Sequence, residues 1–344
     1  MTFIEISGRR IGEGYPPFVI AEIGINHEGE IEKAIQMVDD AISSNCECVK
    51  FQYHIISDEM IPNDVIPGNA EESIWEIMKR CSLSKKEEIY LKDYVTKKGL
   101  IYLSTPFSRA AANELNILGV DWFKIGSGEC NNYPLINHIA SFKKPIILST
   151  GMNNIESIKP AVDIFRKNKV PYGLLHCTSM YPTPYEKVRL GAIKELKNEF
   201  PDAILGLSDH SLGIYTCLGA VSLGASILEK HFTSNKNWDG PDISISIDKV
   251  ELQEMIRGSR AIYQGLGGSK EILHEEQPTI DFAYSSVVSI KKIKAGEVFN
   301  EENIWVKRPG TGEIKAKDYD NILNKFASRD IDINKQLSWE DVCL

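Results

Sequence analysis

The sequence predicts an α/β protein, a (β/α)₈ TIM barrel followed by a smaller β-rich domain. Short apolar runs alternate with longer amphipathic stretches through about the first 265 residues, and eight such units predict a parallel barrel. The alternation stops near Gly265, where glycines and charged residues become frequent. A chain of 344 residues is long enough for a large domain and a small one.

The eight predicted strands are short runs rich in β-branched and aromatic residues. They are residues 18–23, 48–52, 100–104, 122–125, 146–149, 173–176, 204–208 and 227–231. Between them, segments such as 31–43 and 85–98 repeat apolar residues at three- and four-residue spacing, which predicts helices. A doubly wound sheet is the structural alternative. It would usually carry a glycine-rich phosphate turn after the first strand, and Ile23-Gly24-Ile25-Asn26-His27 is not one.

We expect the barrel to span residues 1–270, and an irregular, charged linker carrying Pro278 to span 271–282. Residues 283–344 then read as the small β-rich domain, with strands at 286–290 and 304–308. No internal repeat or low-complexity tract interrupts this plan.

Composition narrows the class of protein. The net charge of −9 argues against a general nucleic-acid binder, although a few lysines in a pocket can still attract a small anion. No apolar run approaches the roughly 18 residues of a membrane helix. The first residues show no secretory signal, and seven scattered cysteines suit reduced thiols. We therefore expect a cytoplasmic protein without nucleic-acid or membrane partners.

Polar side chains end nearly every predicted strand. Because a barrel builds its active site at the carboxyl ends of its strands, these residues predict one shared site. They include Glu22, Lys50, Ser104, Lys124, Ser127, Glu129, Ser149, His176, Ser208, His210, Glu229 and His231. A polar residue commonly ends a single strand without having a function. Polar residues at the ends of all eight predicted strands favour a functional site at the mouth of the barrel.

The role of Lys50 and Lys124 has two interpretations. In the first, one of the two lysines forms a Schiff base with a substrate. The nearby hydroxyls Ser127, Ser149 and Ser208 favour the other reading, a clamp for a phosphate or carboxylate with many acceptor oxygens.

His210 and His231 end adjacent predicted strands and would face the same mouth. With a carboxylate such as Glu129 they could bind a divalent metal, or each could be a histidine satisfied by hydrogen bonds. A His-plus-oxygen site suits Mn²⁺, Mg²⁺, Co²⁺ or Zn²⁺ equally well.

Longer motifs make the chain similar to bacterial N-acetylneuraminate (sialic acid) synthases and their legionaminate relatives. The matching segments are AEIGINHEG (21–29), STPFSR (104–109), FKIGSGECNN (123–132), LSTGM (148–152), HCT (176–178), YPTP (181–184), GLSDH (206–210), GPD (240–242) and NIWVKRPG (303–310). The resemblance runs almost end to end. It implies a barrel followed by an antifreeze-like (SAF) domain, in a domain-swapped homodimer.

The resemblance also implies roles for individual residues. The phosphoenolpyruvate site would comprise Lys50, Lys124, Ser127, Ser149, Ser208 and Ser179, the last where many relatives carry asparagine. The metal, Mn²⁺ first with Mg²⁺ and Co²⁺ as alternatives, would be bound by His210 and His231. Glu22 and Glu129 would act in catalysis with these histidines. Contacts to an N-acetylated amino sugar would come from Asn69, Tyr181, Asp242 and, from the partner chain, Arg308.

The activity this implies is metal-dependent condensation of phosphoenolpyruvate with N-acetylmannosamine and water, giving N-acetylneuraminate and phosphate. Departures such as Phe51-Gln52-Tyr53-His54 and Ile243-Ser244-Ile245-Ser246 lie on the sugar side, so a legionaminate synthase using a 2,4-diacetamido-6-deoxy hexose is the first alternative. A class II aldolase and a non-catalytic sugar-binding or ice-binding protein are alternatives from other classes.

Overall fold

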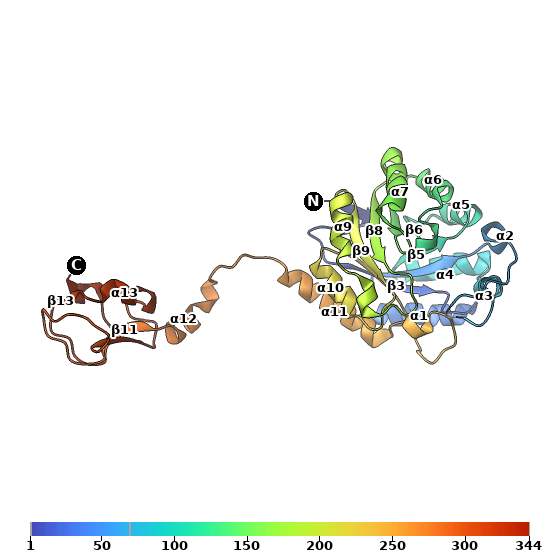
Figure 1. The fold of residues 1–344 in the computed structure, drawn as a ribbon. Helices are drawn as coiled ribbons and strands as arrows, with labels where there is room; N and C mark the ends of the chain where they lie inside the picture. Colours follow the sequence, from blue (N-terminus) through green and yellow to red (C-terminus); the bar gives the residue numbers. More distant parts are fainter. Residues whose placement is uncertain (1, 69, 344) are drawn as a thin grey trace. The chain divides into compact units, whose positions relative to one another are not determined.

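The computed structural model describes residues 2–68 and 70–343. These residues form two compact units, one ending at Gly267 and the other beginning at Gly268, and each is described by itself. The first unit is a barrel and the second a small β-rich fold (Figure 1). Among the helices of the described ranges, none is long and apolar enough to cross a membrane.

Eight parallel strands form the large sheet, in the order β5-β4-β3-β10-β9-β8-β7-β6. Since β5 and β6 also lie next to each other, the sheet nearly closes on itself (Figure 1). The strands are β3 (Phe18–Gly24), β4 (Cys48–Tyr53), β5 (Ile101–Pro106), β6 (Phe123–Ile125), β7 (Ile146–Ser149), β8 (Tyr172–Cys177), β9 (Ile204–Asp209) and β10 (Ile227–His231). Each lies close to its predicted bounds, and the predicted (β/α)₈ barrel is confirmed.

Helices follow the strands and pack their apolar faces on the outside of the barrel (Figure 1). In α1 (Ile31–Ser43) the buried residues Ala34, Met37, Val38 and Ala41 repeat at helical spacing, as the sequence predicted. The others are α2 (Ile56–Glu59), α3 (Ile74–Cys81), α4 (Lys85–Lys97), α5 (Arg109–Leu118), α6 (Tyr133–Ala140), α7 (Ile155–Asn168), α8 (Tyr185–Val188), α9 (Ala192–Glu199), α10 (Tyr215–Ser222) and α11 (Lys249–Gly265).

The barrel interior has an apolar floor and a polar mouth. Successive strand residues point to opposite faces, so alternate positions line the interior. On β10, Ile227 packs in the floor, and Glu229 and His231 follow on the same face. On β3, Ile20 and Glu22 repeat this arrangement. The reactive side chains therefore gather at the carboxyl ends of the strands.

A hairpin that the sequence analysis did not predict contributes to the floor. Its strands are β1 (Phe3–Ile6) and β2 (Arg9–Gly12), and Ile4, Ile6 and Ile11 pack against the inner ends of the barrel strands. A Cβ on Gly12 would lie 2.3 Å from the carbonyl oxygen of Thr2, so only glycine fits where the hairpin ends. The hairpin adds apolar contacts at the end of the barrel away from the mouth.

The second unit contains two small antiparallel sheets around its own apolar core. β11 (Ser286–Ser289) pairs with β12 (Ile304–Lys307), and β13 (Phe326–Ala327) pairs with β14 (Val342–Cys343). The two predicted strands of this region, 286–290 and 304–308, correspond to β11 and β12. The core includes Val287, Phe299, Ile304, Ile314, Ile322 and Leu337.

The predicted irregular linker is partly helical. Residues His274–Glu276 form the 3₁₀ turn η3, and Gln277–Ala283 form α12. Pro278 lies in the first turn of α12, where a missing N–H has no intrahelical acceptor to lose. The prediction of an irregular segment was therefore wrong for these residues.

Candidate active site

The carboxyl ends of the barrel strands surround a cavity of about 370 Å³. Most of the site residues predicted from the sequence line it, namely Glu22, Lys50, Lys124, Ser127, Ser149, Ser179, Tyr181, Ser208, His210 and His231. The lining also includes Gln52, Pro67, Thr105, Phe107, Met152 and Glu229. These side chains come from all eight barrel strands or the loops that follow them, as expected for a barrel enzyme.

Two lysines and two glutamates are buried together in this cavity. Lys50 Nζ lies 2.7 Å from Glu22 Oε2 and 3.8 Å from Glu229 Oε2. Lys124 Nζ lies 3.5 Å from Glu229 Oε1 and donates a hydrogen bond to Ser149 Oγ at 2.7 Å. Both ammonium groups thus lie beside the Glu229 carboxylate, and both line the cavity, where they could also bind an anionic substrate.

Burial and charge act against each other in this cluster. Burial raises the pKa of Glu22 to about 7, although Lys50 opposes the shift. Burial alone would also raise the pKa of Glu229, but Lys124 and Lys50 outweigh it and lower that pKa. Burial lowers the pKa of Lys124, whereas Glu22 and Glu229 raise the pKa of Lys50 against the effect of its burial. Glu229 is thus the stable anion, and Glu22 is able to exchange a proton near neutral pH.

Hydroxyl groups surround the two ammonium groups. Ser208 Oγ donates to Glu229 Oε1 at 2.8 Å, and Lys50 Nζ donates to Thr105 Oγ1 at 3.2 Å. Together with Ser149, these groups supply donors that a phosphate or carboxylate could take over from the protein.

Gly151 lets two further hydroxyls approach the cavity. Its backbone N–H donates to Ser127 Oγ at 2.9 Å. A Cβ on Gly151 would lie 2.3 Å from Ser179 Oγ and 2.9 Å from Ser127 Oγ. Glycine is therefore required here for the two serines to come together.

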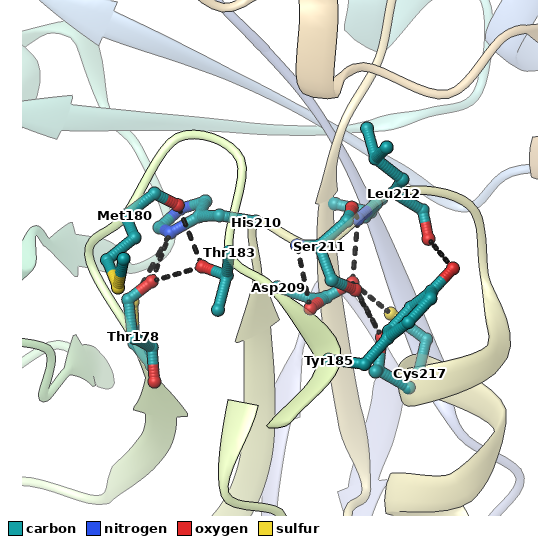
Figure 2. Close-up of polar contacts among 12 residues, drawn as sticks. Thr178, Met180, Thr183, Tyr185, Asp209, His210, Ser211, Leu212 and Cys217 are labelled. Carbon is teal, nitrogen blue, oxygen red and sulfur yellow. Dashed lines mark hydrogen bonds and ion pairs between the residues drawn. The ribbon is translucent and has the colours of Figure 1, made fainter. Parts of the chain in front are cut away.

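The two histidines lie side by side, with ring centroids 5.4 Å apart. His210 Nδ1 lies 3.0 Å from the carbonyl oxygen of Thr178, as Figure 2 shows. A carbonyl can only accept, so Nδ1 carries a proton, and in the neutral imidazole Nε2 then keeps its lone pair. That tautomer is the one in which Nε2 can bind a metal.

His231 is also suited to metal binding. Burial and the positive charges of His210 and Lys50 lower its pKa well below the usual value, so the imidazole is neutral. Among the described residues its buried Nδ1 has no hydrogen-bond partner, and Asp242 Oδ2 lies 3.7 Å away. No cluster of three or more His, Cys, Asp or Glu side chains suited to a metal occurs within residues 2–68 and 70–343. The two imidazoles alone could supply two ligands to a divalent metal, and water or substrate would have to supply the others.

A buried polar network supports the strand ends that carry the histidines. Asp209 Oδ2 accepts hydrogen bonds from Lys230 Nζ at 2.6 Å, Ser211 Oγ at 3.0 Å and Thr216 Oγ1 at 2.8 Å. Figure 2 shows Asp209 and Ser211 beside His210. Since every donor comes from β10 or from the chain after β9, the network fixes both segments.

Apolar side chains also line the cavity. The Tyr181 ring stacks on His210 with centroids 4.2 Å apart, and Pro67, Phe107 and Met152 belong to the same lining. Asp242 is buried beside His231, and burial raises its pKa to about 6 while His210 and Lys50 oppose the shift. Aromatic and carboxyl groups in this combination are suited to an uncharged, partly apolar substrate such as an acetamido sugar.

Glu129 is not among the residues that line this cavity. It lies on the 3₁₀ turn Ser127–Glu129, and its carboxylate accepts a hydrogen bond from Asn132 Nδ2 at 2.5 Å. Its catalytic role stays a prediction. Arg308 belongs to the second unit, and its role also stays a prediction. Asn69 lies outside the described residues.

Strand alternation identifies residues that the sequence analysis misjudged. Glu229 precedes His231 by two positions and Gln52 follows Lys50 by two, so both share the inward face, yet neither was assigned a role. His176 was expected at the mouth, but it points away, with Nε2 2.6 Å from the carbonyl oxygen of Val188.

Comparison with known proteins gives a consistent result. The model of the NeuB family matches residues 37–271, and that of the SAF domain matches 284–342. An uncharacterized protein of Methanocaldococcus jannaschii is 40% identical over 99% of both chains. The N,N'-diacetyllegionaminic acid synthase of Campylobacter jejuni is 38% identical over 90% of this chain and 96% of its own. The crystal structure of N-acetylneuraminic acid (sialic acid) synthetase from Leptospira borgpetersenii superposes with a TM-score of 0.74 at 35% identity, covering 81% of this chain and 95% of that one.

Proposed function

Because the chain belongs to the NeuB family, we propose that it condenses phosphoenolpyruvate with an N-acetylated amino-sugar aldehyde and water. The products are a nine-carbon sialic-type acid and inorganic phosphate. The observation that carries this proposal is the convergence of Lys50 and Lys124 on Glu229, at 3.8 and 3.5 Å. Two buried ammonium groups around one anion position suit a substrate with both a phosphate and a carboxylate.

In the proposed reaction, carbon C3 of phosphoenolpyruvate bonds to the aldehyde carbon, and the aldehyde oxygen becomes a hydroxyl. Water adds at C2 and loses one of its protons, which leaves a hydroxyl on C2. The C2–O bond to phosphate then breaks, the C2 hydroxyl becomes the carbonyl of the product, and its proton leaves with the phosphate. Glu22, with its pKa raised to about 7 by burial, can accept the first proton from the water and pass it to the former aldehyde oxygen.

The side chains have separate tasks in this scheme. Lys50, Lys124 and the hydroxyl of Ser149 bind and orient the anionic substrate. A divalent metal held by His210 and His231 would act as a Lewis acid on the aldehyde oxygen. The stacked ring of Tyr181 covers His210 and limits the access of water to that wall.

For the acceptor we favour a 2,4-diacetamido-6-deoxy hexose, which would give a legionaminic acid. The named relative at 38% identity is a diacetyllegionaminic acid synthase, and the apolar wall of Pro67, Phe107 and Met152 suits acetamido and 6-deoxy methyl groups. N-acetylmannosamine is the second candidate, supported by the similarity to the Leptospira sialic acid synthetase.

We also expect catalysis by a homodimer in which Arg308 reaches the partner's cavity. This expectation comes from the family resemblance and the SAF domain match. It predicts that mixing inactive Arg308→Ala and His231→Ala chains restores activity in heterodimers. A mixture that exchanges subunits but stays inactive would contradict it.

The direct test supplies chelator-treated protein with Mn²⁺, phosphoenolpyruvate and each candidate sugar in turn. Phosphate release and product mass are measured together. Metal-dependent phosphate release with a product of the mass of sugar plus pyruvate supports the proposal, and relative kcat/KM values identify the acceptor.

Two outcomes would assign a different function. Formation of the adduct from pyruvate, without phosphate release from phosphoenolpyruvate, would identify a class II aldolase. Binding of a sugar with no turnover under any metal would identify a sugar-binding protein. The inactive His231→Ala variant is the control for phosphate released by contaminating enzymes.

A further inference from the structure

A buried histidine–glutamate pair lies just behind the cavity wall. His54 follows β4, and its Nδ1 lies 2.7 Å from Oε2 of Glu59, at the end of α2. Their side chains are only 2% and 9% exposed. The His54 ring stacks on Phe107, with centroids 4.6 Å apart and planes 13° from parallel. The imidazole is therefore held on its face and at one nitrogen.

The other nitrogen of His54 connects the pair to the cavity. His54 Nε2 lies 3.1 Å from Oε1 of Gln52, and Gln52 Nε2 donates to Glu22 Oε1 at 3.4 Å. A chain of three hydrogen bonds thus runs from Glu59 through His54 and Gln52 to Glu22. Glu22 and Gln52 line the active-site cavity. Glu59 instead lines a second, neighbouring cavity.

The contacts of Gln52 define the orientation of its amide. The Glu22 carboxylate accepts a hydrogen bond from the Gln52 NH₂ group, and Gln52 Oε1 faces His54 Nε2 on the other side. The Glu59 carboxylate holds the opposite edge of the His54 ring through Nδ1. The His54–Glu59 pair thus supports the orientation in which the amide presents its NH₂ group to Glu22.

Gln52 is placed to act on the second substrate. It lies two residues beyond Lys50 on the inward face of β4, so it is nearer the mouth than the anion cluster. A sugar bound above phosphoenolpyruvate would meet Gln52 and Glu22 together.

We propose that His54 and Glu59 are positioning residues for the sugar acceptor: they hold the Gln52 amide with its NH₂ group toward Glu22. The inference rests on the proposed function, because it assumes that an acceptor sugar binds in the outer cavity. Neither residue needs to touch a substrate for this role.

The test is a double-mutant cycle on the full-length chain. His54→Phe keeps a ring against Phe107 but removes both ring nitrogens. Losing a hydrogen-bonded positioning partner should reduce kcat/KM for the sugar by about tenfold and leave the KM for phosphoenolpyruvate within about twofold. In a Gln52→Leu background the same change should cost less than about twofold, because His54 acts only through Gln52.

Two further variants complete the design. Glu59→Gln keeps an acceptor for His54 Nδ1 but replaces the carboxylate with a neutral amide, so it should give a smaller loss in the same direction. It also replaces His54→Phe in the test if that variant does not fold. His138→Phe is the matched control, because His138 also contacts a phenylalanine ring, Phe142, and bonds Asn113 away from Gln52. Equal losses in the wild-type and Gln52→Leu backgrounds, or an equal rise in the phosphoenolpyruvate KM, would overturn the proposal.

A readout without turnover separates this inference from the proposed function. In protein labelled with ¹⁵N-glutamine, the side-chain NH₂ signals of Gln52 are assigned as those lost in Gln52→Leu. They should shift in His54→Phe and Glu59→Gln and stay unchanged in His138→Phe. Unchanged signals in His54→Phe would refute the positioning role even if the condensation activity is confirmed. A shift in a protein that condenses no sugar would support the positioning of Gln52 while the proposed function fails.

Discussion

Lys230 Nζ lies 2.6 Å from Asp209 Oδ2, and the two side chains are 0% and 1% exposed. The residues pair across β9 and β10, each one position before a cavity histidine. Because neighbours on a strand face opposite ways, the ion pair packs outside the barrel while His210 and His231 face the cavity. One buried pair thus joins the strand ends that carry both imidazoles.

Lys230→Met should therefore destabilise the fold strongly. It leaves the Asp209 carboxylate buried without its cation, and breaking such a pair costs about 3–5 kcal/mol. The free energy of unfolding in urea measures this. Lys236→Met is the control: its partner is Glu251, both side chains are partly exposed, and such a pair contributes about 0–1 kcal/mol. Similar losses in the two variants would show that the buried pair has no special importance.

Removal of the proposed divalent metal should abolish turnover. Because only two imidazoles of the cavity would hold it, chelator treatment should be fully reversible with Mn²⁺, and calorimetric Mn²⁺ binding should disappear in His210→Ala and in His231→Ala. His138→Ala, at a partly buried histidine bonded to Asn113, should bind Mn²⁺ like the wild type. Retained Mn²⁺ binding in both cavity variants would place the metal elsewhere.

Much of the fold could be predicted because barrel strands are short, apolar and regularly spaced. Residues 146–149 and 227–231 were predicted with their observed bounds. The hairpin of β1 and β2 was not, because each strand has only four residues and their pairing becomes favourable only once Ile4 and Ile11 meet the barrel floor. Pro278 led to the wrong prediction of an irregular linker, because a proline is compatible with the first turn of a helix.

The candidate site was predictable where a polar side chain lies near the end of a strand on the inward face. Lys50, Lys124 and Ser208 meet that condition, and they line the cavity. Glu229 was also expected at the mouth, but its contacts with Lys50 and Lys124 depend on how the strands close into the barrel, so the sequence assigned it no role. The direction of Glu129 depends on a hydrogen bond from Asn132, which no spacing rule predicts.

Lys124→Met should weaken phosphoenolpyruvate binding selectively. The change removes a charged donor that lies 2.7 Å from Ser149 Oγ and 3.5 Å from Glu229 Oε1. Loss of a charge-assisted contact predicts a rise in the phosphoenolpyruvate KM of about 10- to 100-fold. Steady-state kinetics with each substrate varied separately measures it, and Lys159→Met, at an exposed lysine, is the control. A larger effect on the sugar KM than on the phosphoenolpyruvate KM would reverse the assignment of the two subsites.

Glu88 provides a pH-dependent test that does not involve the cavity. It is 2% exposed on α4 and accepts a hydrogen bond from Tyr102 OH at 2.7 Å. Burial raises its pKa from about 4.5 to about 7, although the Tyr102 hydrogen bond opposes the shift. Between these values the folded protein holds a proton that the unfolded chain has released. Stability therefore falls as pH rises from about 4.5 to 7.

Glu88→Gln should remove this dependence while keeping an acceptor for Tyr102. Relative to the wild type, the variant should gain about 2 kcal/mol of unfolding free energy when the pH is raised from about 5 to 8. Urea unfolding at both pH values measures the difference, and Glu195→Gln, at an exposed position of α9, should show no comparable gain. A difference between Glu88→Gln and wild type that is equal at both pH values would mean that Glu88 is already ionised in the folded protein at pH 5, held by Tyr102 against the effect of burial.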